Sequence, residues 1–131
     1  MTVVIDASAV VAALVDSGPD GRWAETLLTS ELAAPHLLPV EVANVLRRAV
    51  NAGELTEDIA SLAHADLLDL RVGFVSYDTV AARTWELRHN LTAYDAWYVA
   101  VAELLDVPLA TLDRRLVSAP GPTCSFQLPP R

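Results

Sequence analysis

The stretch TVVIDASAVVAALV, residues 2 to 15, decides the fold, because it joins a strand to a helix through a single acid. Thr2 to Ile5 is a short β-branched run, which is typical of a buried strand. Ala7 to Val15 is apolar and reads as a helix that stops near Gly18 and Pro19. Asp6 lies between the two, at the end of the strand. Such a strand followed by a helix predicts the first unit of a parallel sheet.

Further strands and helices alternate along the rest of the chain. We expect strands at 32–34, 73–76 and 108–112, and a last edge strand at 124–127. Helices are expected from a cap at Asp20 to Leu28, from Pro39 to Ala52, from a cap at Thr56 to Leu70, from a cap at Asp78 to Leu91, from Thr92 to Leu105, and at Arg114 to Val117. The fold class is therefore α/β: a short central parallel sheet of about four or five strands flanked by about seven helices, in three α/β/α layers.

Composition limits the class of protein. The 131 residues are 53% hydrophobic and 20% charged, which predicts one compact domain over residues 1–131. No apolar run is long enough to cross a bilayer, and no signal peptide is recognisable. A single cysteine, Cys124, excludes an internal disulfide and fits the reducing cytoplasm. The net charge of −8 argues against nonspecific nucleic-acid binding, although every basic side chain is arginine, which contacts phosphates well.

Four carboxylates stand at positions where an acid is costly unless it is neutralised: Asp6, Glu41, Asp95 and Asp113. Asp6 and Asp113 each follow an expected strand, so both emerge at the same edge of the sheet if those strands are neighbours. Glu41 and Asp95 lie in the first part of apolar helices. Oxygen ligands of this kind suit Mg²⁺ or Mn²⁺, so the pattern predicts a site for one or two divalent cations.

Ordinary structural roles remain open for each acid alone. Asp6 and Asp113 are good helix caps, and Asp95 completes a capping box with Thr92. Glu41 alone reads as a solvated acid or a partner of Arg48. Capping does not explain why two caps lie at one sheet edge, so the four acids together favour a shared site. We predict three side chains that support these acids. Ser8 lies two residues after Asp6, Thr111 lies two residues before Asp113, and Asn44 lies on the helix of Glu41.

The chain resembles the PIN-domain ribonucleases and, within them, the VapC-like toxins of type II toxin–antitoxin systems. Three stretches carry the resemblance: VVIDASAVVAAL at 3–14, LLPVEVANVLRRAV at 37–50 and LTAYDAWYVAVAELLDVPLATLDRRL at 91–116. Together they span nearly the whole chain and keep the order of the four acids. One departure is Asp106, which stands where relatives often have glycine, in a turn that needs a left-handed backbone.

What the resemblance implies is a PIN-like fold and an Mg²⁺- or Mn²⁺-dependent endoribonuclease that is neutralised by a cognate VapB-like antitoxin. Asp6, Glu41, Asp95 and Asp113 match the metal-binding acids, and Ser8 and Thr111 match the supporting hydroxyls. A homodimer or a toxin–antitoxin hetero-oligomer is expected. We also expect arginines near the acids to contact phosphates of the RNA substrate: Arg47, Arg48, Arg114 and Arg115.

Three other classes compete with this interpretation. A phosphorelay receiver also gathers acids at a sheet edge, but it needs a late lysine and the chain has none. A haloacid-dehalogenase-like phosphatase wants a second acid two residues after the first, where this chain has Ser8. A catalytically inactive PIN-like module that only binds a partner stays open.

Overall fold

A five-stranded parallel sheet forms the centre of the molecule in the computed structural model, which describes residues Met1 to Arg131. The sheet order is β3-β2-β1-β4-β5, and every neighbouring pair is parallel. The strands are β1 (Thr2–Ile5), β2 (Glu31–Pro35), β3 (Val72–Val75), β4 (Leu109–Ala110) and β5 (Phe126–Gln127). The predicted parallel α/β fold class is confirmed.

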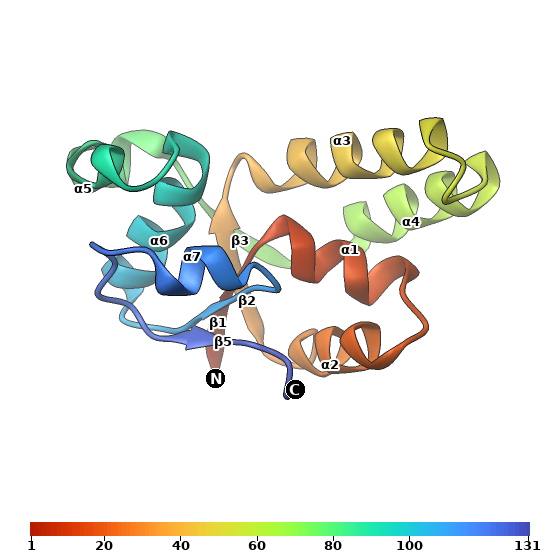
Figure 1. The fold of residues 1–131 in the computed structure, drawn as a ribbon, viewed down its shortest axis with the longest axis horizontal. Helices are drawn as coiled ribbons and strands as arrows, with labels where there is room; N and C mark the ends of the chain where they lie inside the picture. The colour runs from red at the N-terminus through yellow and green to blue at the C-terminus, as the bar shows by residue number, and fades with distance from the viewer.

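Seven α-helices and one 3₁₀ turn cover the sheet: α1 (Ala7–Val15), α2 (Pro19–Leu27), α3 (Leu38–Asn51), α4 (Glu57–Asp69), α5 (Tyr77–Glu86), η1 (Leu87–His89), α6 (Ala93–Leu105) and α7 (Arg114–Ser118). Helices α1 to α4 pack on one another, while α5 packs on α6 on the other side of the sheet, as Figure 1 shows. Helix α6 is the most enclosed, because every residue from Tyr98 to Ala102 is buried. None of the helices is long and apolar enough to cross a membrane.

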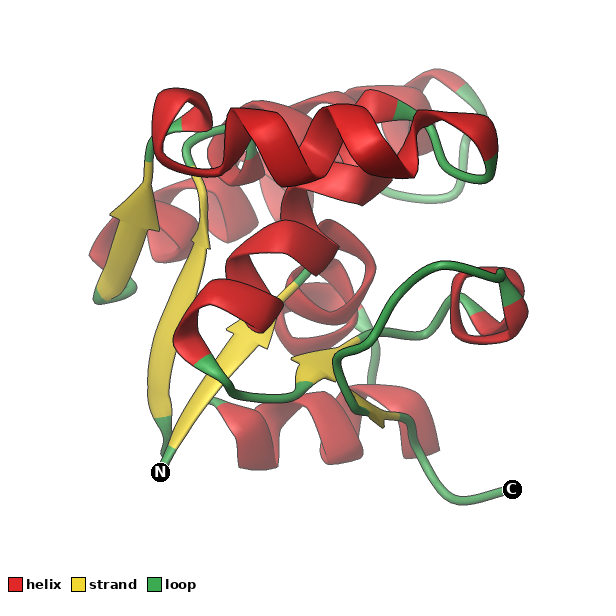
Figure 2. Cartoon of the chain, turned by 90° about the vertical axis from the view of Figure 1, so that its left-hand side faces the viewer, coloured by secondary structure: helices red, strands yellow, loops and turns green.

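The strand order changes direction between β1 and β4. From β1 the chain passes through α1 and α2 to β2 and then outward to β3, whereas from β4 it passes through α7 to β5 on the opposite side. In open α/β sheets the crevice at such a switch point, beyond the carboxyl ends of the strands, is where sites form. Figure 2 shows helices lying on both sides of the strands. Asp6 follows β1 and Asp113 follows β4, so the topology places both acids at this switch point.

Several predicted boundaries are wrong by small amounts. Strand β3 is shifted by one residue, and the last two strands are shorter than 108–112 and 124–127. Strand β4 ends early because the backbone N–H of Leu112 donates to Ser8 Oγ at 3.1 Å and leaves the sheet. The helix predicted from Asp78 to Leu91 ends at Glu86 and continues only as η1.

Two predicted helix caps are also wrong. Helices α2 and α5 begin before Asp20 and Asp78, and the flanking residues are Gly18 and Ser76. Pro19 takes the first helical position of α2, where its missing N–H costs nothing. Each acid lies instead in the first turn, where the positive end of the helix favours a carboxylate.

The turn before β4 has the left-handed backbone expected of it. Asp106 ends α6 with φ 55° and is the one non-glycine residue with positive φ in the chain. Its position allows the backbone N–H to reach carbonyls of the last helical turn, at Ala102 and Glu103. Aspartate tolerates this conformation at some cost, because its short polar side chain reduces the usual steric penalty.

Candidate active site

Asp6 is held by three donors at the end of β1. It is only 8% exposed, and Oδ1 accepts hydrogen bonds from Ser8 Oγ at 2.6 Å and from the Ala9 N–H at 3.1 Å. Oδ2 accepts a short hydrogen bond from Thr111 Oγ1. The Ala9 contact makes Asp6 the N-cap of α1, so the predicted capping role is real. Capping uses one of its three hydrogen bonds, and the other two come from the predicted supporting hydroxyls.

The same two hydroxyls tie β1 to the segment after β4. Ser8 Oγ accepts from the Leu112 N–H, and Thr111 Oγ1 accepts from the Asp113 N–H at 3.0 Å. Each hydroxyl therefore donates to Asp6 and accepts from the β4 extension, which fixes its single proton toward the carboxylate. Both Asp6 and Thr111 are buried, so the orientation of the carboxylate is set by packing as well as by hydrogen bonds.

Glu41 lies in the first turn of α3 and faces Tyr98 of α6. Its Oε1 is buried without a hydrogen bond, and so is the Tyr98 hydroxyl. Burial raises the pKa of Glu41, and the charges of Asp95 and Asp6 raise it further, while the nearby phenol opposes the shift. Burial also raises the pKa of Tyr98, with Glu41 as the next cause, so the phenol stays protonated.

Asp95 and Asp113 complete the group on the α6 and α7 side. Asp95 lies in the first turn of α6, and its N–H donates to Thr92 Oγ1 at 3.2 Å, as the capping interpretation predicted. Burial raises the pKa of Asp95, and the charge of Asp113 adds to this. Asp113 Oδ1 caps α7 by accepting from the backbone N–H groups of Arg115 and Leu116. Its side chain is 36% exposed, so it is far more open to solvent than Asp6.

The four acids thus form one electrostatic group from four separate elements. Burial and mutual repulsion together raise the pKa of Asp6, Glu41 and Asp95. The all-oxygen donor set and the unpaired Glu41 Oε1 fit a hard divalent cation. In this arrangement the carboxylates stand apart, and no three His, Cys, Asp or Glu side chains lie close enough to hold one ion jointly.

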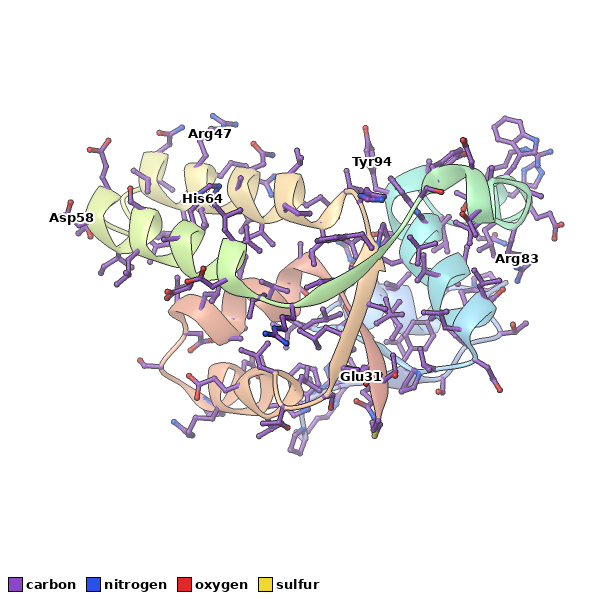
Figure 3. All side chains as sticks on the ribbon, turned by 180° about the vertical axis from the view of Figure 1, so that it is seen from behind. Glu31, Arg47, Asp58, His64, Arg83 and Tyr94 are labelled. Carbon is purple, nitrogen blue, oxygen red and sulfur yellow. The ribbon has the colours of Figure 1, made fainter.

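The remaining predicted residues lie at different distances from these acids. Arg115 is at the group, since its Nε is 3.7 Å from Asp113 Oδ1 and its charge lowers the pKa of Asp95. Arg114 turns away and donates to the Pro129 carbonyl at 3.1 Å. Arg47 donates to Asn44 Oδ1 at 3.1 Å on the exposed side of α3, so Asn44 contacts none of the acids. Figure 3 shows Arg47 on the part of α3 away from the sheet, and Arg48 is exposed on the same helix.

Sequence reasoning missed Tyr98. The signal was present, because Tyr98 follows Asp95 by three residues and so lies on the same face of α6. A tyrosine inside a run of small apolar residues is typical of core packing. Its hydroxyl becomes relevant to the site only because α3 places Glu41 opposite it. That neighbour is not visible in the sequence.

Comparisons with known proteins show the family of this chain. The family model described as PIN domain matches residues 3–122. Ribonuclease VapC1 of Mycobacterium tuberculosis is 44% identical over 128 residues, which covers 95% of this chain and 96% of that protein.

Two solved structures share the fold. The crystal structure of PAE2754 from Pyrobaculum aerophilum has a TM-score of 0.70 at 26% identity and covers 96% of this chain and 83% of that one. The structure of VapBC2 from Rickettsia felis bound to a promoter DNA fragment has a TM-score of 0.69 at 12% identity and covers 98% of both chains. With the acids at the switch point and a relative this similar over its full length, the chain belongs to the PIN-domain family and, within it, to the VapC-like proteins.

Proposed function

We propose that this protein is an endoribonuclease that hydrolyses RNA phosphodiester bonds with one or two Mg²⁺ or Mn²⁺ ions held by Asp6, Glu41, Asp95 and Asp113. The observation that carries the proposal is the convergence of the buried Asp6 with the half-buried Glu41 and Asp95 at the sheet's switch point, where burial and mutual repulsion raise the pKa of all three. Natural folds bury charge at this cost where it serves a function. The 44% identical relative, named a ribonuclease, supports RNA as the substrate.

The four acids differ in how firmly they are held. Asp6 is the central group. Ser8 donates to one of its carboxylate oxygens and Thr111 to the other, so the carboxylate is held in one orientation. Glu41 and Asp95 flank it and carry fewer hydrogen bonds, so their side chains are freer to adjust to an ion. Asp113 spends one oxygen on capping α7 and stands at the outside of the group. The cation, when bound, supplies a nucleophilic water at neutral pH and charge stabilisation for the scissile phosphate.

Arg115 is the best placed cation for a phosphate of the substrate. It is almost fully exposed and lies beside Asp113 at the mouth of the group. A guanidinium there can donate hydrogen bonds to a phosphate without first breaking a buried interaction. The proposal assigns Arg47, Arg48 and Arg114 to more distant phosphates at most, because two of them are already engaged with Asn44 and Pro129.

We also propose a VapB-like antitoxin as the partner, in a toxin–antitoxin hetero-oligomer or on a homodimer of this chain. Exposed apolar side chains on α4 support a partner: Ile59, Leu62 and Leu68. They lie on the same helix as Ala63 and Leu67, which are buried in the core. Similar solved structures that carry the name VapBC also support this assignment.

Cleavage by the purified protein tests the enzyme proposal. We expect cleavage of an unstructured RNA pool in Mg²⁺ or Mn²⁺, no cleavage in EDTA, and products with 5′-phosphate and 3′-hydroxyl ends. Asp6→Asn should abolish turnover and keep the fold, while Asp66→Asn, at an exposed acid on α4, should cleave like the wild type. Turnover by Asp6→Asn in Mg²⁺ would overturn the assignment.

A catalytically inactive partner-binding module is the second candidate. It is favoured by the spacing of the acids, since no three of them lie close enough to hold one ion. Copurification of this chain with a small partner, together with no cleavage of any RNA in the presence of cation, would select it.

A further inference from the structure

Few buried polar side-chain atoms lack a hydrogen-bond partner, and most of them lie at the site. Three such side-chain atoms occur in the whole chain: Glu41 Oε1, Trp97 Nε1 and the Tyr98 hydroxyl. Unpaired buried groups are rare in folded proteins, and each calls for an explanation. Two of the three belong to Glu41 and Tyr98, which face each other across the site from α3 and α6.

Packing alone does not explain the hydroxyl of Tyr98. The residue is 3% exposed and begins the enclosed run of α6, where a phenylalanine ring would fill the same space. A buried hydroxyl that lacks a partner lowers stability, because it gives up its hydrogen bonds to water. In this chain the hydroxyl lies opposite Glu41, whose Oε1 is also buried without a partner.

A phenol in this position suits one task. A phenol is protonated and uncharged at neutral pH, so it can donate a hydrogen bond to a carboxylate without adding charge. Glu41 is the acid in contact with it, and Glu41 has no other side-chain donor. By contrast, Asp6 is oriented by two hydroxyls. Groups behind the ligands of a metal site orient those ligands and set the affinity for the ion.

We propose that Tyr98 is a positioning residue, whose hydroxyl orients the Glu41 carboxylate for a divalent cation. Tyr98 then does for Glu41 what Ser8 and Thr111 do for Asp6. The inference rests on the proposed cation-dependent function, and it assigns to α6 a second contribution to the site besides Asp95.

Calorimetric titration of the RNA-free protein with Mn²⁺ tests the inference. Tyr98→Phe should bind Mn²⁺ about 10-fold more weakly than the wild type, the low end of what loss of such an orienting group costs. Tyr94→Phe is the matched control, because the same hydroxyl is removed one turn earlier on α6 from a side chain that is 62% exposed, and its affinity should not change. In EDTA, Tyr98→Phe should melt at the same temperature as the wild type or higher, since it loses a buried unpaired hydroxyl.

A double-mutant cycle separates positioning from a general disturbance of the core. If Tyr98 acts through Glu41, Tyr98→Phe should add no further loss of Mn²⁺ affinity in a Glu41→Gln background. Equal affinity of Tyr98→Phe and the wild type would overturn the inference, and so would an equal loss in both backgrounds. Wild-type protein that binds no Mn²⁺ at all would instead overturn the proposed function.

Discussion

Removal of the Thr111 hydroxyl should destabilise the protein far more than the change in size suggests. Thr111→Val keeps the shape of a fully buried side chain but deletes an oxygen that donates to Asp6 and accepts from the Asp113 N–H. Asp6 would lose one of its two hydroxyl donors while remaining buried, and one backbone N–H would lose its acceptor. A hydrogen bond to a charged group is worth about 1.5–3 kcal/mol and a neutral one about 1. The two losses together predict a destabilisation of about 2.5–4 kcal/mol.

Thermal melting in EDTA at pH 7.5 measures this loss. A change of 1 kcal/mol corresponds to about 3–5 °C for a domain of this size, so the melting temperature should fall by roughly 8–20 °C. Thr84→Val is the matched control, because Thr84 is equally buried but only donates to the Val80 carbonyl within its own helix. That carbonyl keeps its ordinary helical partner, so the control should change by less than about 1 kcal/mol. Equal destabilisation by the two substitutions would refute the reasoning.

Three further changes have defined outcomes. Folding raises the pKa of Asp6, so the contribution of Asp6 to stability is greatest below the ordinary value of 3.8 and is lost as the pH rises through the folded pKa. The melting temperature of the wild type in EDTA should therefore fall relative to that of Asp6→Asn as the pH rises. A difference that does not depend on pH would contradict this. Asp106→Gly should raise the free energy of unfolding in urea by about 0.5–1 kcal/mol, because glycine adopts φ 55° without strain, and a neutral result would speak against the left-handed turn. Arg83→Met removes the guanidinium that donates to Glu103 Oε1 at 2.6 Å, and it should cost about 1–2 kcal/mol of stability because the pair is partly exposed. The Thr123 N–H also donates to Glu103, so its hydrogen exchange should become faster. Unchanged exchange would show that the Arg83–Glu103 pair does not hold the loop at Thr123.

Much of the fold could be predicted because the local signals agree with one another. The strand, acid and helix at residues 2–15 keep their predicted bounds, and the predicted cap at Thr56 is confirmed. Boundaries failed where a tertiary contact competes with the strand pattern, as at Leu112, whose N–H bonds to Ser8. That contact joins residues more than a hundred positions apart and leaves no local trace in the sequence.

The site divides in the same way. Asp6 and Asp113 could be placed together because parallel strands end at one edge, and their proximity to Asp95 follows from the folded chain. The directions of long side chains could not be predicted. Arg114 and Arg115 are adjacent in sequence, yet one meets the C-terminal tail at Pro129 and the other meets Asp113. Which of them remains free for a phosphate depends on where the tail folds back.

Anomalous diffraction from crystals grown with Mn²⁺ tests the central claim most directly. We expect one or two manganese peaks among the carboxylates of Asp6, Glu41 and Asp95, and none there in Asp6→Asn crystals treated in the same way. Manganese bound only elsewhere on the molecule, or no peak at the acids in crystals of a protein that cleaves RNA in Mn²⁺, would contradict it.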